Sequence, residues 1–352
     1  MPAEDTFWHR KRVLLTGHTG FKGSWLTIWL ERAGAKITGI SLPPATTPNL
    51  YTEARVDRLC DNHYCDIRDA SALASLIKKV QPEIVFHLAA QPLVRASYRE
   101  PRTTFDTNVM GTANLLDSLR DCGSTRVTVM ITTDKVYRDT ENGVPSREQD
   151  PLGGHDPYSA SKAACEIVIA SYRDAFLAEN NLAVASARAG NVMGGGDWSE
   201  DRLIPDAVRA WQMSRELEVR RPDARRPWQH VLEPLFGYMT LARKLWHQPS
   251  LAGAYNFGPQ PGDAVTVRAL VEMARTSFGS GLVRYSTAEE GPHETTSISL
   301  EIAKARVALG VEPRLSLAQA IARTMAWYRS RQEGADALAL CRAEIGSYEA
   351  AS

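Results

Sequence analysis

Apolar residues follow two different spacings along residues 1–190 of the chain. Short, nearly continuous apolar runs predict buried strands, and longer stretches with an apolar residue every three or four positions predict amphipathic helices. The predicted strands are 11–16, 36–42, one ending at Asp66, 83–90, 126–132 and 182–188. The predicted helices are 25–33, 73–80, 101–122 and one that begins near Tyr158. This alternation predicts an α/β fold built on a doubly wound parallel sheet.

Beyond residue 190 the regular alternation ends. A glycine-rich loop at 194–198 is followed by helical patterns near 203–213 and 270–278 and by a capping-box sequence at 316–319. We therefore expect a dinucleotide-binding-type domain over 1–190 and a smaller, mainly helical substrate domain over 191–352, with some later strands returning to the first domain. In such folds ligands bind beyond the carboxyl ends of the strands, where the smaller domain would close over the sheet.

Composition narrows the class of protein. The formal net charge is zero, so no overall field attracts nucleic acid or an anionic membrane. No stretch approaches the ~18 uninterrupted apolar residues of a transmembrane helix, and residues 1–10 lack the apolar segment of a signal peptide. We expect a cytoplasmic protein with neither a nucleic-acid nor a membrane partner.

The five cysteines raise the question of a metal site. Cys60 and Cys65 flank His63, but this spacing matches no familiar zinc pattern. Reduced thiols near a strand are the simpler interpretation, and we expect no metal.

The link between the first predicted strand and helix carries the first candidate chemistry. It reads Gly17-His18-Thr19-Gly20-Phe21-Lys22-Gly23. A strand, a G-x-x-G-x-x-G loop and a helix form the context of a dinucleotide site, in which the glycines permit the turn, the approach of the pyrophosphate and close helix packing. The alternative is a glycine-rich turn that binds nothing.

Further cofactor-binding positions follow from the strand ends. The second strand ends at Ser41 rather than at an acidic residue that would bind the ribose 2′-hydroxyl of NAD, so this position is compatible with NADP as well. Asp66, followed by Ile67, could accept a hydrogen bond from the adenine amino group; a helix cap is the other use of this acidic stretch and suits Asp69 better. We predict that the cofactor contacts Gly17, Thr19, Gly20, Phe21, Gly23, Asp66, Ile67, Leu88, Ala89, Ala90, Tyr158 and Lys162.

Two segments supply candidate catalytic groups. The strand at 126–132 runs into Thr133-Asp134-Lys135, and a later helix opens with Tyr158 and Lys162 at i and i+4, which places them on one face. An ammonium beside a phenol favours phenolate, so Lys162 is expected to lower the pKa of Tyr158.

The run at 220–228 is rich in arginine and ends at Trp228. It could be a short nucleic-acid patch or a solvated surface loop. In a dinucleotide-fold protein we favour a site for a diphosphate and a base, because guanidinium groups bind phosphates in a bidentate manner.

Together these motifs resemble those of extended short-chain dehydrogenases/reductases that modify nucleotide sugars, and within that group the CDP-glucose 4,6-dehydratases. The resemblance covers about residues 7–330 and rests on the segments 16–26, 87–94, 133–137, 156–162, 190–198 and 226–235. The more specific parts are the lysine at 135, where dTDP-glucose dehydratases carry glutamate, and the segment 228–235. The resemblance implies bound NAD, cytidine diphosphate glucose as substrate, a homodimer and a place in the synthesis of deoxysugars such as those of lipopolysaccharide O-antigens.

The same resemblance implies a role for each catalytic residue. Tyr158 removes the proton of the sugar 4-hydroxyl as carbon 4 is oxidised, and Thr133 hydrogen-bonds that oxygen. Asp134, protonated because burial raises its pKa, donates to the hydroxyl that leaves carbon 6. Lys135 either is neutral and removes the proton at carbon 5, or stays charged and stabilises the enolate, with Tyr158 or a water as the base. Asn191, Arg202 and Arg226 are assigned to the nucleotide diphosphate and base.

Two other functions compete with dehydration. A 4-epimerase or 4-keto reductase shares the Tyr/Lys pair but needs no acid and base at carbons 6 and 5. A non-catalytic dinucleotide-sensing scaffold would retain the fold, but such proteins usually lose that pair.

Overall fold

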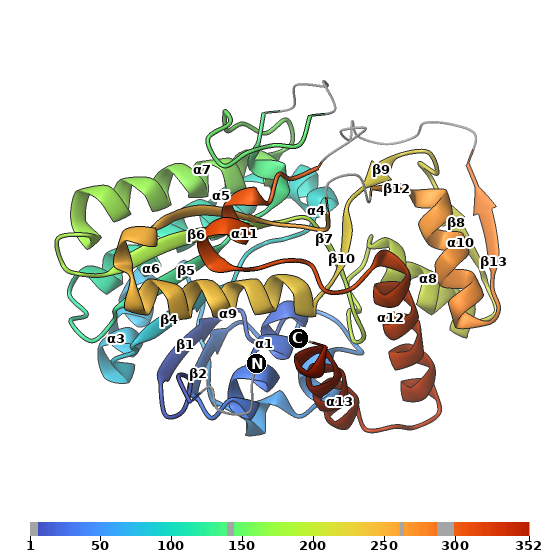
Figure 1. Ribbon diagram of the computed structural model, residues 1–352, viewed down its shortest axis with the longest axis horizontal. Coiled ribbons are helices and arrows are strands. Elements are labelled where there is room, and N and C mark those ends of the chain that lie inside the picture. The colour runs from blue at the N-terminus through green and yellow to red at the C-terminus, as the bar shows by residue number, and fades with distance from the viewer. Residues whose placement is uncertain (1–5, 139–143, 261–263, 287–298, 352) are drawn as a thin grey trace.

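A seven-stranded parallel sheet occupies the centre of the computed structural model, which describes residues 6–138, 144–260, 264–286 and 299–351 (Figure 1). The strand order is β11-β6-β5-β4-β1-β2-β3. The strands of this sheet are β1 (Arg12–Thr16), β2 (Lys36–Ser41), β3 (Asp61–Tyr64), β4 (Ile84–His87), β5 (Val127–Ile131), β6 (Ala183–Ala189) and β11 (Gly253–Phe257). The order reverses between β1 and β4, which marks the point where ligands bind in open α/β sheets. The predicted doubly wound fold is confirmed.

Three pairs of short strands lie outside this sheet. They are β7 (Asn191–Met193) with β10 (Trp228–His230), β8 (Glu216–Val219) with β13 (Leu282–Tyr285), and β9 (Arg225–Arg226) with β12 (Val265–Thr266). The helices are α1 (Phe21–Arg32), α2 (Leu50–Glu53), α3 (Ala70–Val80), α4 (Val94–Arg99), α5 (Pro101–Phe105), α6 (Gly111–Arg120), α7 (Pro157–Tyr172), α8 (Leu203–Gln212), α9 (Leu232–His247), α10 (Val267–Phe278), α11 (Ala303–Leu309), α12 (Leu317–Gln332) and α13 (Ala337–Ala350).

Helices cover both faces of the sheet because neighbouring side chains of a strand point in opposite directions. On β1, Leu14 packs in the hydrophobic cluster that includes Leu73 of α3 and Leu116 of α6. Leu15 packs in the other cluster, which includes residues of α1 and α9. The two layers are visible on either side of the sheet in Figure 1.

Several predicted boundaries were wrong. The first helix begins at Phe21 rather than at residue 25, so Gly23 lies inside it. The helix predicted over 101–122 is confirmed as a continuous helical stretch from Pro101 to Arg120, with a wider π-helical turn at Asp106–Met110 between α5 and α6. The sequence also gave no signal for α9, because most of its residues are buried and an amphipathic stripe is therefore missing.

The elements after residue 190 do not all lie in one region. Strand β11 pairs in parallel with β6 at the edge of the central sheet, whereas α8, α10 and α12 lie with the short strands at the other end of the view in Figure 1. The division of the chain at residue 190 stays a prediction. Within the described part of the chain, we find no helix both long and apolar enough to cross a membrane.

Candidate active site

A cavity of about 1520 Å³ opens at the carboxyl ends of the central strands. Segments from before and after residue 190 line it together. It contains all the residues predicted from the sequence: Gly17, Thr19, Gly20, Phe21, Gly23, Asp66, Ile67, Leu88, Ala89, Ala90, Thr133, Asp134, Lys135, Tyr158, Lys162, Asn191, Arg202 and Arg226. The structure therefore brings the predicted cofactor-binding, catalytic and substrate-binding residues into one cavity.

The glycine-rich loop has no room for side chains. Gly17 has φ +78°, and a Cβ there would lie 2.6 Å from the Ala89 backbone nitrogen. A Cβ on Gly23 would lie 2.1 Å from the Gly17 carbonyl oxygen. Gly20 precedes α1 and leaves the helix N-terminus without a side-chain cap. Free N–H groups and the positive end of the helix dipole suit a pyrophosphate, so the loop fits a dinucleotide.

Residues at the ends of β2 and β3 are the candidates for contacts with the ribose and the adenine of such a dinucleotide. The Ser41 hydroxyl lies 2.8 Å from the Thr19 hydroxyl, which also donates to the Leu42 carbonyl. The Asp66 carboxylate accepts from the Arg68 guanidinium at 2.6 Å, and its contact with adenine stays a prediction. Asp69 caps α3 by accepting from the Ala72 N–H, as the sequence suggested.

The catalytic segment lies at the end of β5. Thr133 Oγ1 donates to Asp134 Oδ1 at 2.9 Å, and Thr133 is also close enough to Tyr158 to lower the pKa of the phenol. Tyr158 stands in the first turn of α7, which begins with Pro157 and is capped by Asp156. Thr133 therefore lies close to both the phenol and the carboxylate, two groups from separate elements.

Lys162 was expected to lower the pKa of Tyr158, and in the protein without a bound cofactor this expectation is wrong. Burial raises the pKa of Tyr158 to about 12, and the groups that lower it are Thr133 and Arg202 rather than Lys162. The reason is where the amine points: Lys162 Nζ donates to the Ile131 carbonyl oxygen at 3.3 Å. Burial also lowers the pKa of Lys162.

Asp134 has the property that a general acid requires. Burial raises its pKa, although Lys135, Thr133 and Arg226 act in the opposite direction. Its side chain is 3% exposed. Gly190 leaves room for the carboxylate, since a Cβ there would lie 3.0 Å from Asp134 Oδ2.

Lys22 was read from the sequence only as a loop residue. In the structure it lines the cavity, and its amine donates to the Tyr238 hydroxyl at 2.9 Å. Burial, and then the charges of Arg202 and Lys162, lower its pKa to about 7. A lysine in a glycine-rich loop gave no signal that it would turn toward the catalytic groups.

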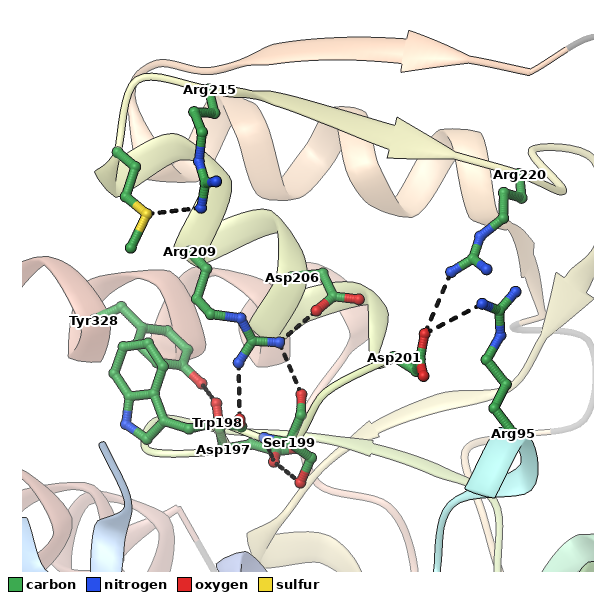
Figure 2. Close-up of polar contacts among 11 residues, drawn as sticks. Arg95, Asp197, Trp198, Ser199, Asp201, Asp206, Arg209, Arg215, Arg220 and Tyr328 are labelled. Atoms are coloured by element: carbon green, nitrogen blue, oxygen red, sulfur yellow. Dashed lines mark hydrogen bonds and ion pairs between the residues drawn. The ribbon is translucent and has the colours of Figure 1, made fainter. Parts of the chain in front are cut away.

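Arg202 directly precedes α8. The loop that leads to it, which includes Asp197 and Trp198, is held by residues of α8 and α12 (Figure 2). Tyr328 of α12 donates to the Asp197 carbonyl at 2.6 Å, and Arg209 of α8 donates to the Trp198 carbonyl at 2.7 Å. The Asp197 carboxylate in turn lies 3.3 Å from the Arg202 guanidinium. Packing within the later part of the chain thus fixes a cation beside Tyr158.

The other predicted substrate residues lie on paired strands. Asn191 of β7 is opposite Trp228 of β10. Arg226 is 6% exposed and close enough to Asp134 to lower its pKa. The pairing brings the basic run to the catalytic segment, which excludes the alternative of a solvated loop for Arg226.

Comparisons with known proteins agree with this geometry. The family model described as GDP-mannose 4,6 dehydratase matches residues 14–324. The chain is 42% identical to the CDP-glucose 4,6-dehydratase of Salmonella typhimurium over 99% of both chains, and 31% identical to the dTDP-glucose 4,6-dehydratase of Streptomyces antibioticus over 76% of each.

Solved structures give the same result. The dTDP-glucose 4,6-dehydratase DesIV of Streptomyces venezuelae, with NAD and TYD bound, superposes with a TM-score of 0.76 at 26% identity, covering 93% of this chain and 99% of that one. MoeE5 in complex with UDP-glucuronic acid and NAD also gives 0.76, at 25% identity, over 91% of this chain and 99% of that one. The resemblance inferred from the motifs is confirmed, and the chain belongs to the GDP-mannose 4,6-dehydratase family of nucleotide-sugar dehydratases.

Proposed function

We propose that this protein converts CDP-D-glucose to CDP-4-keto-6-deoxy-D-glucose. The reaction oxidises carbon 4, eliminates water across carbons 5 and 6, and reduces carbon 6. The proposal is supported by the Salmonella relative, whose identity extends over 99% of both chains. It makes the protein a hydro-lyase with no net consumption of cofactor.

The observation that carries this proposal is that Tyr158 and Asp134 line one cavity, in which Thr133 donates to Asp134 and also affects the pKa of Tyr158. Oxidation at carbon 4 needs a base for the 4-hydroxyl proton, and loss of the 6-hydroxyl needs an acid. A phenol and a carboxylic acid on the same side of a hexose can perform these two steps.

NAD is the proposed cofactor, and when bound it would take up hydride from carbon 4 and return it to carbon 6. The proposed contacts are the glycine loop and the strand ends, with Tyr158 and Lys162 beside the nicotinamide. NAD is bound in the DesIV and MoeE5 structures. The preference for NAD over NADP is a proposal, because the Ser41 end of β2 is compatible with both.

Tyr158 acts as the base for the 4-hydroxyl proton. Because burial holds the pKa of the free phenol at about 12, the group needs a positive charge to ionise near neutral pH. Arg202 already lowers this pKa, and the nicotinamide cation would act in the same direction. Thr133 then hydrogen-bonds the substrate oxygen.

Asp134 donates its proton to the hydroxyl that leaves carbon 6, and the raised pKa keeps that proton available. Lys135 serves carbon 5 in one of two ways. It is either a neutral base that removes the carbon 5 proton, or a charged group that stabilises the enolate while Tyr158 or a water removes that proton. The pH profiles of Lys135→Ala and Lys135→Glu separate the two roles. Near-normal elimination by Lys135→Ala would contradict both.

Asn191, Arg202 and Arg226 hold the nucleotide diphosphate and base in this proposal. Their support is their position: all three line the cavity that contains the catalytic groups. Arg226→Glu is expected to weaken substrate binding, and an unchanged affinity would remove Arg226 from the assignment.

The test is a mass-spectrometric assay with CDP-, dTDP-, UDP- and GDP-sugars, each with and without added NAD. We expect loss of one water from CDP-glucose with no net change in cofactor. Turnover of another nucleotide sugar alone would overturn the choice of cytidine, and a product of unchanged mass would indicate an epimerase instead.

The competing functions have weaker support. Epimerases share this fold, as the UDP-glucose 4-epimerase of Thermotoga maritima illustrates with a TM-score of 0.78 at 20% identity. An epimerase or a 4-keto reductase has no use for a buried acid at the position of Asp134. A cofactor-sensing scaffold has no use for the Tyr158–Thr133–Asp134 arrangement.

We also propose a homodimer whose two active sites act independently. Exposed apolar side chains occur on the neighbouring segments α5 to α7: Phe105 is 39%, Met110 52% and Ile167 62% exposed. Exposed large apolar side chains on segments that pack against one another are candidates for an interface. Ile167→Lys is expected to yield monomers in size-exclusion chromatography with light scattering, and an unchanged dimer would exclude this surface. The cytoplasmic location and the O-antigen pathway stay predictions from the sequence.

A further inference from the structure

A buried ion pair lies directly behind the catalytic segment. Glu166 stands one helical turn after Lys162 on α7, and Arg188 is on β6. Arg188 Nη2 and Glu166 Oε2 are 2.7 Å apart, and the two side chains are 4% and 3% exposed. Neither residue lines the cavity, so the mechanism proposed above does not use them.

The carboxylate of this pair is bonded to the residue just before the catalytic segment. Thr132 Oγ1 donates to Glu166 Oε1 at 2.5 Å. Ser186 donates to the other oxygen, Glu166 Oε2, at 2.7 Å. Thr132 is the neighbour of Thr133 in the chain, whereas Ser186 is in the middle of β6.

The guanidinium of the pair is bonded to the other end of the segment. Arg188 Nη1 donates to the Tyr137 hydroxyl at 2.8 Å, and that hydroxyl donates to Asn256 Oδ1 on β11 at 2.6 Å. Tyr137 is 8% exposed and Asn256 is fully buried. Residues 133–136 are therefore held at both ends by one ion pair.

We infer that Thr132 and Tyr137 are positioning residues, which together with the Glu166–Arg188 pair fix Thr133 and Asp134 relative to Tyr158 and the sugar. Breaking the Glu166–Arg188 pair would be costly, because either charge would be left uncompensated in the protein interior. The Glu166–Arg188 pair is therefore a rigid anchor. Because it holds both ends of residues 133–136, it fixes the positions of Thr133 and Asp134. A misplacement of about 1 Å can lower a catalytic rate by about 100-fold.

The alternative is that these contacts serve stability alone. Thr132→Val and Tyr137→Phe each remove one hydroxyl that ties the segment to the ion pair, with little change of shape. Ser186→Ala is the matched control: it removes a buried hydroxyl from the same carboxylate, but from a residue outside the segment. Glu166 and Arg188 are left in place, since removing either could prevent folding.

The inference rests on the proposed dehydration, so wild-type conversion of CDP-glucose is measured first. If the wild type does not convert CDP-glucose, the proposed function is wrong, and this result is distinct from a failure of the positioning role. For Thr132→Val and Tyr137→Phe we expect kcat to fall by about 10- to 100-fold with KM changed by no more than about threefold. For Ser186→Ala we expect kcat within about twofold of wild type. Thermal unfolding of all three variants is measured in parallel.

Two results would overturn the inference. One is an equal loss of kcat in Ser186→Ala and in the two segment variants, which would indicate a general structural role. The other is wild-type kcat in Thr132→Val and Tyr137→Phe, or a loss confined to KM.

Discussion

Thr133 donates its hydroxyl hydrogen to the carboxylate of Asp134, with 2.9 Å between Thr133 Oγ1 and Asp134 Oδ1. This bond alone favours the ionised carboxylate, yet burial outweighs it and the pKa of Asp134 is raised. The site therefore offers a proton donor where the sequence has an ordinary strand-end aspartate.

Asp134→Asn is expected to block elimination while leaving the oxidation of carbon 4 possible. Removing a general acid typically lowers the rate by about 10²- to 10⁴-fold. In a single turnover we expect the near-ultraviolet absorbance of reduced nicotinamide to rise and persist, with no loss of water by mass spectrometry. In the wild type, kcat should fall as the pH rises through the raised pKa of Asp134, because the acid loses its proton. Normal water loss by Asp134→Asn would contradict the role.

Lys22→Met is expected to remove a pH dependence of stability. The folded pKa is lowered to about 7, whereas the unfolded lysine titrates near ~10.4. Between these values the unfolded chain holds a proton that the folded chain lacks, so the free energy of unfolding increases with pH, by up to a few kcal/mol.

Urea unfolding of the wild type, Lys22→Met and the exposed-site control Lys79→Met across this window measures the effect. The Lys22→Met curve should be flatter than the other two. Parallel curves for all three proteins would show that Lys22 does not titrate in the folded state.

Gly20→Ala and Gly23→Ala are expected to fail in different ways. A Cβ at Gly23 would lie 2.1 Å from the Gly17 carbonyl oxygen, whereas at Gly20 the same atom is 3.4 Å away. Overpacking should cost Gly23→Ala about 1–3 kcal/mol of stability. Gly20→Ala should unfold at the wild-type temperature but bind NAD about tenfold more weakly, which corresponds to about 1.4 kcal/mol. Thermal unfolding and NAD titration check both predictions. Wild-type NAD affinity in Gly20→Ala would contradict the assignment of the pyrophosphate to this loop.

Asp201 holds two arginines at the edge of the cavity (Figure 2). Its Oδ1 lies 3.3 Å from Arg95 and 3.5 Å from Arg220, and all three side chains are between 33% and 40% exposed. Asp201→Asn should leave both guanidinium charges to attract the diphosphate, which lowers KM by about two- to fivefold at low salt and little at high salt. Stability should change by less than about 1 kcal/mol.

Asp223→Asn is the control, because it removes the same charge from a side chain that is 87% exposed and outside the cavity. A salt-independent rise of KM in Asp201→Asn would contradict the electrostatic account.

Sequence patterns were sufficient to predict those features that depend on residues close together in the chain. The glycines at 17, 20 and 23 and the Tyr158/Lys162 spacing are set by a tight turn and by helix geometry, and both were recognised from the sequence. Asp134 was found because it directly follows a buried strand, and parallel strands place such residues at one edge of a sheet.

Contacts between distant segments had no local signal. Nothing near Lys162 indicated that its amine would bond the Ile131 carbonyl instead of acting on Tyr158. Helix α9 was missed because it is buried on most sides. The return of a later strand to the sheet was expected, but the residues of β11 were not assigned, because its place beside β6 depends on a crossover.

The sequence by itself determined the parallel α/β fold and indicated the glycine-rich loop and the candidate catalytic groups, because each depends on patterns within one segment. Only the tertiary structure decided the charge states and the supports of those groups. Burial raised the pKa values of Asp134 and Tyr158, and the Glu166–Arg188 pair bound both ends of one catalytic segment. Desolvation and buried ion pairs depend on what surrounds a side chain in three dimensions.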